Sequence, residues 1–409
     1  MPIIGVIAEY NPFHNGHIYQ IQEVRHRYPT AHIVVVMSGA FTQRGLPAIL
    51  DKWTRASIAC MHGADLVAEL PAVFALRSAQ DFARGGIALL HRLGCVDYVA
   101  FGAESNPSIL SALASTLENA STQKEIQRHI RAGDAYAVAV SKAISGQSLM
   151  DEDALRTPNN ILAVEYLRSL HHLQSPIEPI ALLRKSAAHN ETKLQRDISS
   201  ATAIRRACMA SPPMWDAIRT AVPSESCHAL QASAAEGYPS MDTLHRLLIR
   251  EILTRSDAEL SELAGVSEGI EHRLRRAAKE SNSYEELADY VQNRRFPYSR
   301  VQRLLSYILL RLTKEDIAEF DRALPLYVRP LAFKKSAHVL TRIRKECRLP
   351  LISRVATELS EEQLLQTSQR TALQKMLRYD LLANDLQALS KPAIGTLRQD
   401  YLQSPICLP

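Results

Sequence analysis

Two periodicities divide the first half of the chain into alternating predicted elements. Short apolar runs, typical of buried strands, lie at 3–8, 33–37, 66–71, 98–101 and 179–183. Helical spacing of apolar residues predicts helices over 18–28, 51–62, 78–93 and 158–167, and a further helical stretch over 107–149. Because strands and helices alternate, we expect an α/β fold with a parallel sheet and right-handed crossovers.

The second half of the chain is mainly helical, and turn-forming residues mark where it begins. Pro212-Pro213 and the Ala/Ser-rich stretch 230–237 end the first region. Amphipathic helices are predicted over 241–255, 270–279, 284–292 and 299–313, strands over 327–333 and 351–355, and an irregular last dozen residues. The predicted organisation is an α/β domain over 1–211, a helical region over 212–325 and a small α/β element over 326–409.

The first predicted strand leads into His14-Asn15-Gly16-His17, at the start of a predicted helix. In an α/β unit, ligands bind at the carboxyl ends of strands, beside the free N–H groups of the next helix. His14 and His17 lie one turn apart, so both can donate hydrogen bonds to a phosphate and stabilise a leaving pyrophosphate. Gly16 permits close approach of a phosphate or ribose. The alternative is that one histidine caps the helix and the other is exposed.

The His-x-Gly-His motif after a first strand resembles the signature of the nucleotidyltransferases related to class I aminoacyl-tRNA synthetases. Those enzymes attack the α-phosphate of a nucleoside triphosphate. Residues 9–17, Asp-Lys-Trp-Thr-Arg at 51–55 and Gly-Ala-Asp-Leu-Val at 63–67 are similar, more narrowly, to the bacterial tRNA(Met) cytidine acetate ligase family. The resemblance implies a Rossmann-like sheet and an enzyme that activates acetate with ATP. It also implies transfer of the acetyl group to the wobble cytidine of elongator tRNA(Met), giving N4-acetylcytidine.

The resemblance also implies which residues contact ATP, and they lie at predicted strand ends and helix starts. They are Ile7, Ala8, Glu9, Tyr10, Asn11, Pro12, Phe13, His14, Asn15, Gly16, His17, Gly102, Asn160, Arg184, Ser200 and Thr202. Arg184 offers a planar donor fork that suits phosphates, and the hydroxyls of Ser200 and Thr202 suit the β- and γ-phosphates. Simple capping of a helix is the alternative for Asn160 and Ser200, with Asn159 as the natural N-cap of the helix over 158–167.

Lys52 and Arg55 complete the catalytic set that the resemblance implies, together with His14 and His17. Their spacing of three on a predicted helix lets both reach one anion, although the same spacing describes two ordinary surface charges. The family's later loop is usually rich in glycine and carries an aromatic residue just before its histidine. Here Ser186-Ala187-Ala188 precedes His189, so the role of His189 stays open.

Charge is unevenly distributed along the chain. The net charge is +5, whereas residues 271–350 hold 18 Lys/Arg against 10 Asp/Glu, a local charge of 18 − 10 = +8. Basic side chains beside an exposed aromatic ring suit RNA, whose phosphates supply affinity and whose unstacked bases stack on rings. The predicted RNA-binding residues are Arg273, Arg275, Arg276, Lys279, Arg294, Arg295, Tyr298, Arg300 and Arg303. Solvated helix faces are the alternative.

Hydropathy and cysteine spacing bear on the location of the protein and on its metal content. No apolar run approaches the roughly 20 residues of a membrane helix, and a signal peptide is not indicated, so we expect a cytoplasmic protein without membrane partners. The six cysteines form no C-x-x-C pair, and no metal cage is evident, so Mg²⁺ is expected only with ATP. A small-molecule nucleotidyltransferase and a non-catalytic, ATP-binding RNA-binding protein remain as alternatives. The oligomeric state is not indicated.

Overall fold

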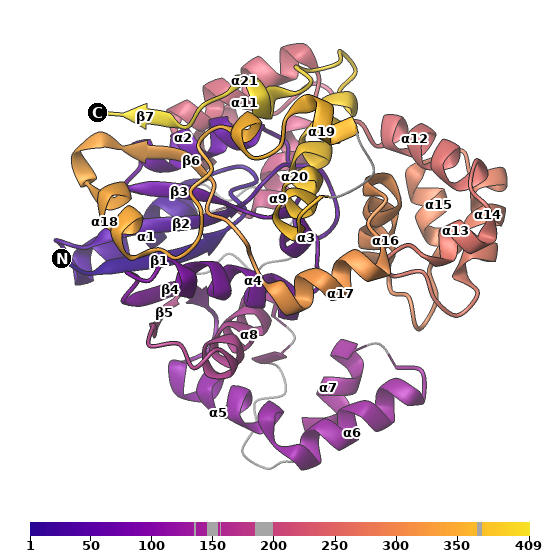
Figure 1. Cartoon of the computed structure of the whole chain (residues 1–409), viewed down its shortest axis with the longest axis horizontal. Helices are drawn as coiled ribbons and strands as arrows, with labels where there is room; N and C mark the ends of the chain where they lie inside the picture. The colour runs from indigo at the N-terminus through magenta and orange to yellow at the C-terminus, as the bar shows by residue number, and fades with distance from the viewer. Residues whose placement is uncertain (135, 145–153, 156, 185–198, 366–369) are drawn as a thin grey trace.

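A seven-stranded sheet lies at the centre of the protein (Figure 1). The computed structural model describes residues 1–134, 136–144, 154–155, 157–184, 199–365 and 370–409. The strands are β1 (Ile3–Ala8), β2 (His32–Ser38), β3 (Leu66–Leu70), β4 (Tyr98–Ala103), β5 (Glu178–Leu183), β6 (Pro330–Lys334) and β7 (Ile406–Leu408). Their order is β5-β4-β1-β2-β3-β6-β7, and β1 to β5 pair in parallel. The predicted α/β fold with a parallel sheet is confirmed.

Helices cover both faces of this sheet, which explains why β1, β2 and β4 carry apolar residues on both faces. In β2, Val34 and Val36 belong to the core shared with α4 (Ala79–Arg92) and α8 (Pro158–His172). Ile33 and Val35 belong to the core on the other face, with α1 (Asn15–Arg27) and α2 (Lys52–Met61). Successive side chains of a strand point to opposite faces of the sheet. A strand that is covered on both faces therefore buries nearly all its side chains, and most of them are apolar.

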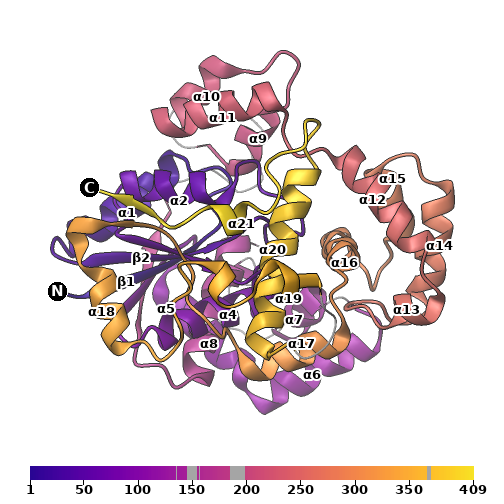
Figure 2. The same ribbon diagram turned by 45° about the horizontal axis from the view of Figure 1, so that its top comes forward.

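The remaining helices form groups around the sheet. They are α3 (Ala72–Ala75), α5 (Pro107–Glu118), α6 (Ala120–Arg131), α7 (Tyr136–Ile144), α9 (Ala201–Cys208), α10 (Trp215–Ala221), α11 (Ser224–Glu236), α12 (Met241–Leu253), α13 (Asp257–Ser261), α14 (Ile270–Glu280), α15 (Tyr284–Val291), α16 (Tyr298–Leu310), α17 (Lys314–Ala323), α18 (Val339–Glu346), α19 (Glu361–Leu365), α20 (Ala372–Leu389) and α21 (Gln399–Leu402). Figure 2 shows α9 to α11 grouped together and α12 to α16 as a lobe on one side. That lobe has its own apolar core. No helix in the described part of the chain is long and apolar enough to cross a membrane.

The C-terminal residues return to the central sheet. Strand β6 pairs antiparallel with β3, and β7 pairs in parallel with β6. The predicted strand over 351–355 is wrong, because Leu351 forms an isolated bridge with Val328 and a 3₁₀ helix follows at Val355–Thr357. The last dozen residues are not irregular, since α21 and β7 lie among them. Such short elements depend on partners elsewhere in the chain, so local sequence gives little sign of them. The boundaries at 211 and 325 stay predictions.

A buried network of ion pairs links this C-terminal segment to α2 and β3. The Lys52 ammonium lies 2.8 Å from a carboxylate oxygen of Glu69 on β3 and 2.7 Å from one of Asp400 on α21. Arg329, just before β6, pairs with both Glu69 and Asp400. The side chains of these four residues are at most 2% exposed. The ring of Trp53 lies 5.6 Å from the Lys52 ammonium and 5.5 Å from the Arg329 guanidinium, so it adds a cation–π contact to each cation.

A fifth buried residue, Asp380 on α20, adjoins this network. One of its oxygens accepts a hydrogen bond from the Ala72 amide at 2.7 Å, and the other accepts one from the Tyr327 hydroxyl. Burial, with the negative charge of Glu69 as a second cause, raises the pKa of Asp380 to about 7. The folded protein therefore holds a proton on this carboxyl at pH values where an unfolded chain has lost it.

We expect Asp380→Asn to flatten the pH dependence of stability between about pH 4 and pH 7. A carboxyl whose folded-state pKa lies above its unfolded value binds its proton more tightly in the folded state, so the free energy of unfolding falls as pH rises through that window. Asparagine cannot ionise and removes this contribution. Urea unfolding at a series of pH values measures it, with Asp242→Asn on the exposed face of α12 as the control. Parallel pH curves for wild type and Asp380→Asn would contradict the assignment.

Candidate active site

The His14–His17 segment opens α1 at the carboxyl end of β1, as the sequence predicts. His14 is the N-cap of α1, and its Nδ1 atom accepts a hydrogen bond from the Gly16 amide at 3.1 Å. The His14 amide in turn donates to Nδ1 of His17, also at 3.1 Å. The two imidazoles thus form a reciprocal capping box, a role more often filled by serine and glutamate. Both histidines satisfy backbone amides that would otherwise lack partners at the start of the helix.

These hydrogen bonds also fix the state of the two rings. Because each Nδ1 accepts an N–H, a neutral ring carries its proton on Nε2. Burial, reinforced by the charges of Arg184 and Arg205, lowers the pKa of His14 to about 3. Burial, the neighbouring His14 and Arg184 place the pKa of His17 well below its ordinary value. The stacked rings, with centroids 3.7 Å apart, therefore offer two neutral Nε2–H donors at neutral pH.

Aromatic packing and backbone contacts hold the preceding loop in place. The buried Tyr10 ring lies edge-on to Phe13 and His17, with centroids 4.8 and 4.7 Å away. The Asn11 side-chain oxygen accepts a hydrogen bond from the Ile49 amide at 2.8 Å. Of the predicted ATP contacts in this stretch, Ile7 and Ala8 end β1, while Glu9, Pro12, Asn15 and Gly16 lie in or beside the loop. The structure thus places the residues predicted over 7–17 at one strand end.

Arg184 and Gly102 lie at the same edge of the sheet. Gly102 is in β4 opposite Leu182 of β5, and Arg184 directly follows β5. A Cβ atom added at Gly102 would lie 3.3 Å from Cγ of Arg184, so glycine leaves room for this side chain. The charge of Arg184 helps to lower the pKa of both His14 and His17. The edge therefore combines two neutral donors with a planar cation.

A second helix start, that of α9, contributes to this edge. Ser200 is its N-cap, and the Ser200 hydroxyl accepts a hydrogen bond from the Ala203 amide at 3.1 Å. Arg205 donates to the Asn11 carbonyl at 2.7 Å and to the Thr202 hydroxyl at 3.1 Å. The sequence prediction missed Arg205 as a site residue, although it lies one turn after Thr202 and so faces the same way. His189, whose role the sequence left open, lies outside the described residues.

Asn160 is buried, and its side chain forms hydrogen bonds with the loop that follows β4. Its amide oxygen accepts hydrogen bonds from the amides of Glu104 at 2.9 Å and Ser105 at 3.1 Å, and its nitrogen donates to the Ser105 hydroxyl. The side chain therefore positions the loop after Gly102. The predicted cap is wrong, since Thr157 is the N-cap of α8 and Asn159 instead donates to the Glu104 carboxylate.

Lys52 and Arg55 do not converge on one open anion position in this structure. The Lys52 ammonium is fully buried between Glu69 and Asp400. Arg55 is also fully buried and donates to the backbone carbonyls of Leu50, Glu9, Ser38 and Gly39. Burial lowers the Arg55 pKa to about 10, so the guanidinium remains charged at neutral pH. The hydrogen bonds of Arg55 join the residues that follow β1 and β2. The N–H donors of both Lys52 and Arg55 are therefore already used within the protein.

Most of the predicted RNA-binding residues have partners within the protein. Arg294 pairs with Asp134 at 2.5 Å and Arg295 with Glu268 at 2.5 Å. Arg300 lies 4.1 Å from the Phe296 ring centroid, and Arg303 is half-buried, with its backbone beside Gly45. Tyr298 is half-buried. Arg273 donates hydrogen bonds to backbone carbonyls at the end of α15, and Arg275 pairs with Asp257. Arg276 and Lys279 are exposed on α14.

We expect Asn160→Ala to lower the free energy of unfolding by about 1–3 kcal/mol, because the amides of Glu104 and Ser105 lose their acceptor in a buried position. Urea denaturation measures this change. Asn159→Ala is the matched control, since Asn159 lies next in sequence but is only partly buried, and surface substitutions usually cost less than about 0.5 kcal/mol. Equal stabilities of the two variants would show that Asn160 does not anchor the loop.

Comparison with known proteins places this geometry in a family. The model of the HIGH Nucleotidyl Transferase family matches residues 1–400. The tRNA(Met) cytidine acetate ligase of Syntrophomonas wolfei is 35% identical over 418 residues, covering 99% of each chain. That of Halothermothrix orenii is 32% identical over 420 residues, covering 98% of each.

Solved structures agree with the sequence relatives. The chain is similar to the crystal structure of apo Thermotoga maritima TmcAL, with a TM-score of 0.90, 30% identity and full coverage of both chains. TmcAL bound with alpha-thio ATP gives a TM-score of 0.88 at 29% identity, again over both full chains. With its paired histidines at the first strand end, this chain belongs to the HIGH nucleotidyl transferases and, within them, to the tRNA(Met) cytidine acetate ligase family.

Proposed function

We propose that this protein is an ATP-dependent ligase that acetylates the wobble cytidine of elongator tRNA(Met). The observation that carries the proposal is the pair of neutral Nε2–H donors of His14 and His17 at the start of α1, with Arg184 and Arg205 beside them. Such a group suits a triphosphate. The ATP analogue bound by the TmcAL neighbour and the names of the relatives support this assignment.

The reaction divides into two steps at this edge. An acetate oxygen attacks the α-phosphorus of ATP, the bond to the bridging oxygen breaks, and pyrophosphate leaves. The N4 amine of cytidine then attacks the acetyl carbon of acetyl-adenylate, loses a proton, and expels AMP. Because His14 has a pKa of about 3, it acts as a hydrogen-bond donor to the developing charge and not as a proton donor. Positioning the two reactants contributes roughly 7–11 kcal/mol to such steps.

The proposal divides the main site residues by role. His14, His17, Arg184, Arg205, Ser200 and Thr202 contact the phosphates, Gly102 leaves space for the nucleotide, and Asn160, Lys52 and Arg55 position the surrounding loops. Mg²⁺ accompanies the triphosphate and supplies charge neutralisation there. The carboxylates at this edge, Glu9 and Glu104, already accept hydrogen bonds from Gln43 and Asn159, so they do not form a ready cage for the ion.

For tRNA, the proposal uses the helical region over 212–325 and its exposed basic side chains. Arg276 and Lys279 on α14 face solvent, and the side chains of Arg294 and Arg295 remain 69% and 50% exposed despite their acidic partners. Phosphates can compete for such exposed pairs, because a surface ion pair contributes little by itself. Because its substrate is a tRNA, we expect the enzyme to act in the cytoplasm.

We expect His14→Ala and His17→Ala to lower acetate-dependent ATP–pyrophosphate exchange by about 10²–10³-fold, as for the loss of a transition-state donor. His26→Ala, an exposed change in the last turn of the same helix, is the control and should keep the wild-type rate. Mass spectrometry of nucleosides from tRNA incubated with ATP and labelled acetate detects the product. Exchange that needs another acceptor, or no exchange at all, would reject the proposed reaction.

We expect the double variant Arg276→Gln/Lys279→Gln to bind tRNA more weakly while keeping pyrophosphate exchange. The slope of log affinity against log salt concentration should become shallower by roughly 0.7–0.9 for each phosphate that the variant no longer neutralises. Filter binding at several salt concentrations measures the slope. Arg275→Gln is the control, because Asp257 already occupies that guanidinium. Undiminished affinity in a well-folded double variant would exclude this face of α14 from the RNA site.

A further inference from the structure

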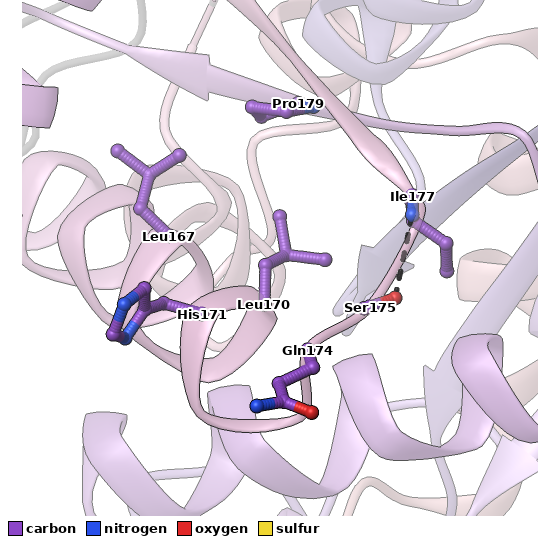
Figure 3. Close-up of a pocket in the computed structure, with 7 residues that line it drawn as sticks. All are labelled: Leu167, Leu170, His171, Gln174, Ser175, Ile177 and Pro179. Carbon is purple, nitrogen blue, oxygen red and sulfur yellow. Dashed lines mark hydrogen bonds between the residues drawn. The ribbon is translucent and has the colours of Figure 1, made fainter.

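The C-terminal ends of α5 and α8 meet at the edge of the sheet opposite the nucleotide site. A cavity of about 430 Å³ lies there, lined by Leu167, Leu170 and His171 of α8 and by the turn into β5 (Figure 3). A second cavity, of about 360 Å³, lies between α5 and α8 and also has Leu167 and His171 in its wall. His171 therefore stands between two hollows that the proposed ligase reaction does not use.

Three side chains at this point have the chemistry of metal ligands. Glu118 is the last residue of α5, and His171 and His172 are the last two of α8. One ligand atom from each lies within 4.8 Å of the other two. Ligand atoms around a tetrahedral zinc ion are roughly 3.3 Å apart, given bond lengths of about 2.0–2.2 Å. Both imidazoles are exposed, and the His172 side chain is 59% exposed, so the rings have room to turn toward a shared ion.

The charges around Glu118 favour a bound cation. One oxygen of the Glu118 carboxylate accepts a hydrogen bond from Arg168 at 2.6 Å and lies 3.1 Å from Nε2 of His172. Arg168 does not neutralise the carboxylate fully, because its guanidinium also binds both oxygens of Glu165 at 3.0 Å. The C-terminal ends of two helices add negative potential at the same place.

We propose that Glu118, His171 and His172 form a zinc site that joins α5 to α8, with water as the fourth ligand. Two imidazoles and one carboxylate suit Zn²⁺, whereas Mg²⁺ and Ca²⁺ prefer oxygen ligands throughout. Arg168, which donates to Glu118 at 2.6 Å, acts as the outer partner that orients the carboxylate. Asn160 lies twelve positions before His172 on α8, or roughly 18 Å along the helix axis, so the ion is structural and lies outside the nucleotide site.

Titration of the metal-stripped, full-length protein with zinc chloride tests the site. Calorimetry should show one bound equivalent in wild type, and Glu118→Gln, His171→Ala and His172→Ala should each weaken binding by at least about tenfold. The exposed His228 on α11 provides the control, because His228→Ala should leave zinc affinity unchanged. Cobalt(II) used as a spectroscopic probe should give d–d absorption bands in wild type that His171→Ala abolishes.

Two results would overturn the proposal. One is the absence of a stoichiometric zinc site in wild type, and the other is zinc binding that survives His171→Ala and Glu118→Gln, which would indicate adventitious surface binding. His171→Ala changes an exposed ring, so it keeps the test decisive if Glu118→Gln disturbs folding through Arg168. Metal-stripped wild type should keep acetate-dependent pyrophosphate exchange when Mg²⁺ is restored, which separates this site from the proposed ligase chemistry.

Discussion

The buried ion network of Lys52, Glu69, Arg329 and Asp400 is the constraint on which the nucleotide edge depends. It fixes α2, β3 and the C-terminal segment to one another without contact with water. Glu69 also packs closely against Gly39. A Cβ atom added at Gly39 would lie 2.1 Å from Oε1 of Glu69, so only glycine fits there. Removing one partner of such a buried group leaves an uncompensated charge, at a typical cost of about 3–5 kcal/mol. The loop after β2 is therefore held in place by buried charges of the protein itself.

The side chains proposed to bind the ligand also form hydrogen bonds with the protein backbone. Each histidine of the tetrad uses Nδ1 to cap α1, and that use leaves Nε2–H as its remaining donor. Arg205 joins the two helix starts by binding the Asn11 carbonyl. Burial keeps the rings neutral, so the charge at this edge comes from arginines. The arrangement is rigid before any ligand arrives, which is what stabilisation of a developing charge requires.

The parts that could be predicted from the sequence are those whose signal is local. The runs that form β1 to β5 and the helix start at His14 are determined by neighbouring residues, and Arg205 could have been found from its spacing after Thr202. The contacts that the sequence does not reveal depend on distant partners. Lys52 lies beside Asp400, far away in the sequence, and the Asn160 side chain bonds the loop after β4. Strand β7 exists because β6 offers an open edge.

The position of Asp400 on α21 affects how the protein is made. During synthesis, Lys52 and β3 emerge early, whereas the carboxylate that completes their network belongs to Asp400, far later in the sequence. Until then, burying Lys52 and Arg329 against Glu69 leaves an excess of positive charge in an apolar layer, which opposes tight packing of α2. Tight packing of α2 around both cations therefore requires that the segment carrying α21 has docked.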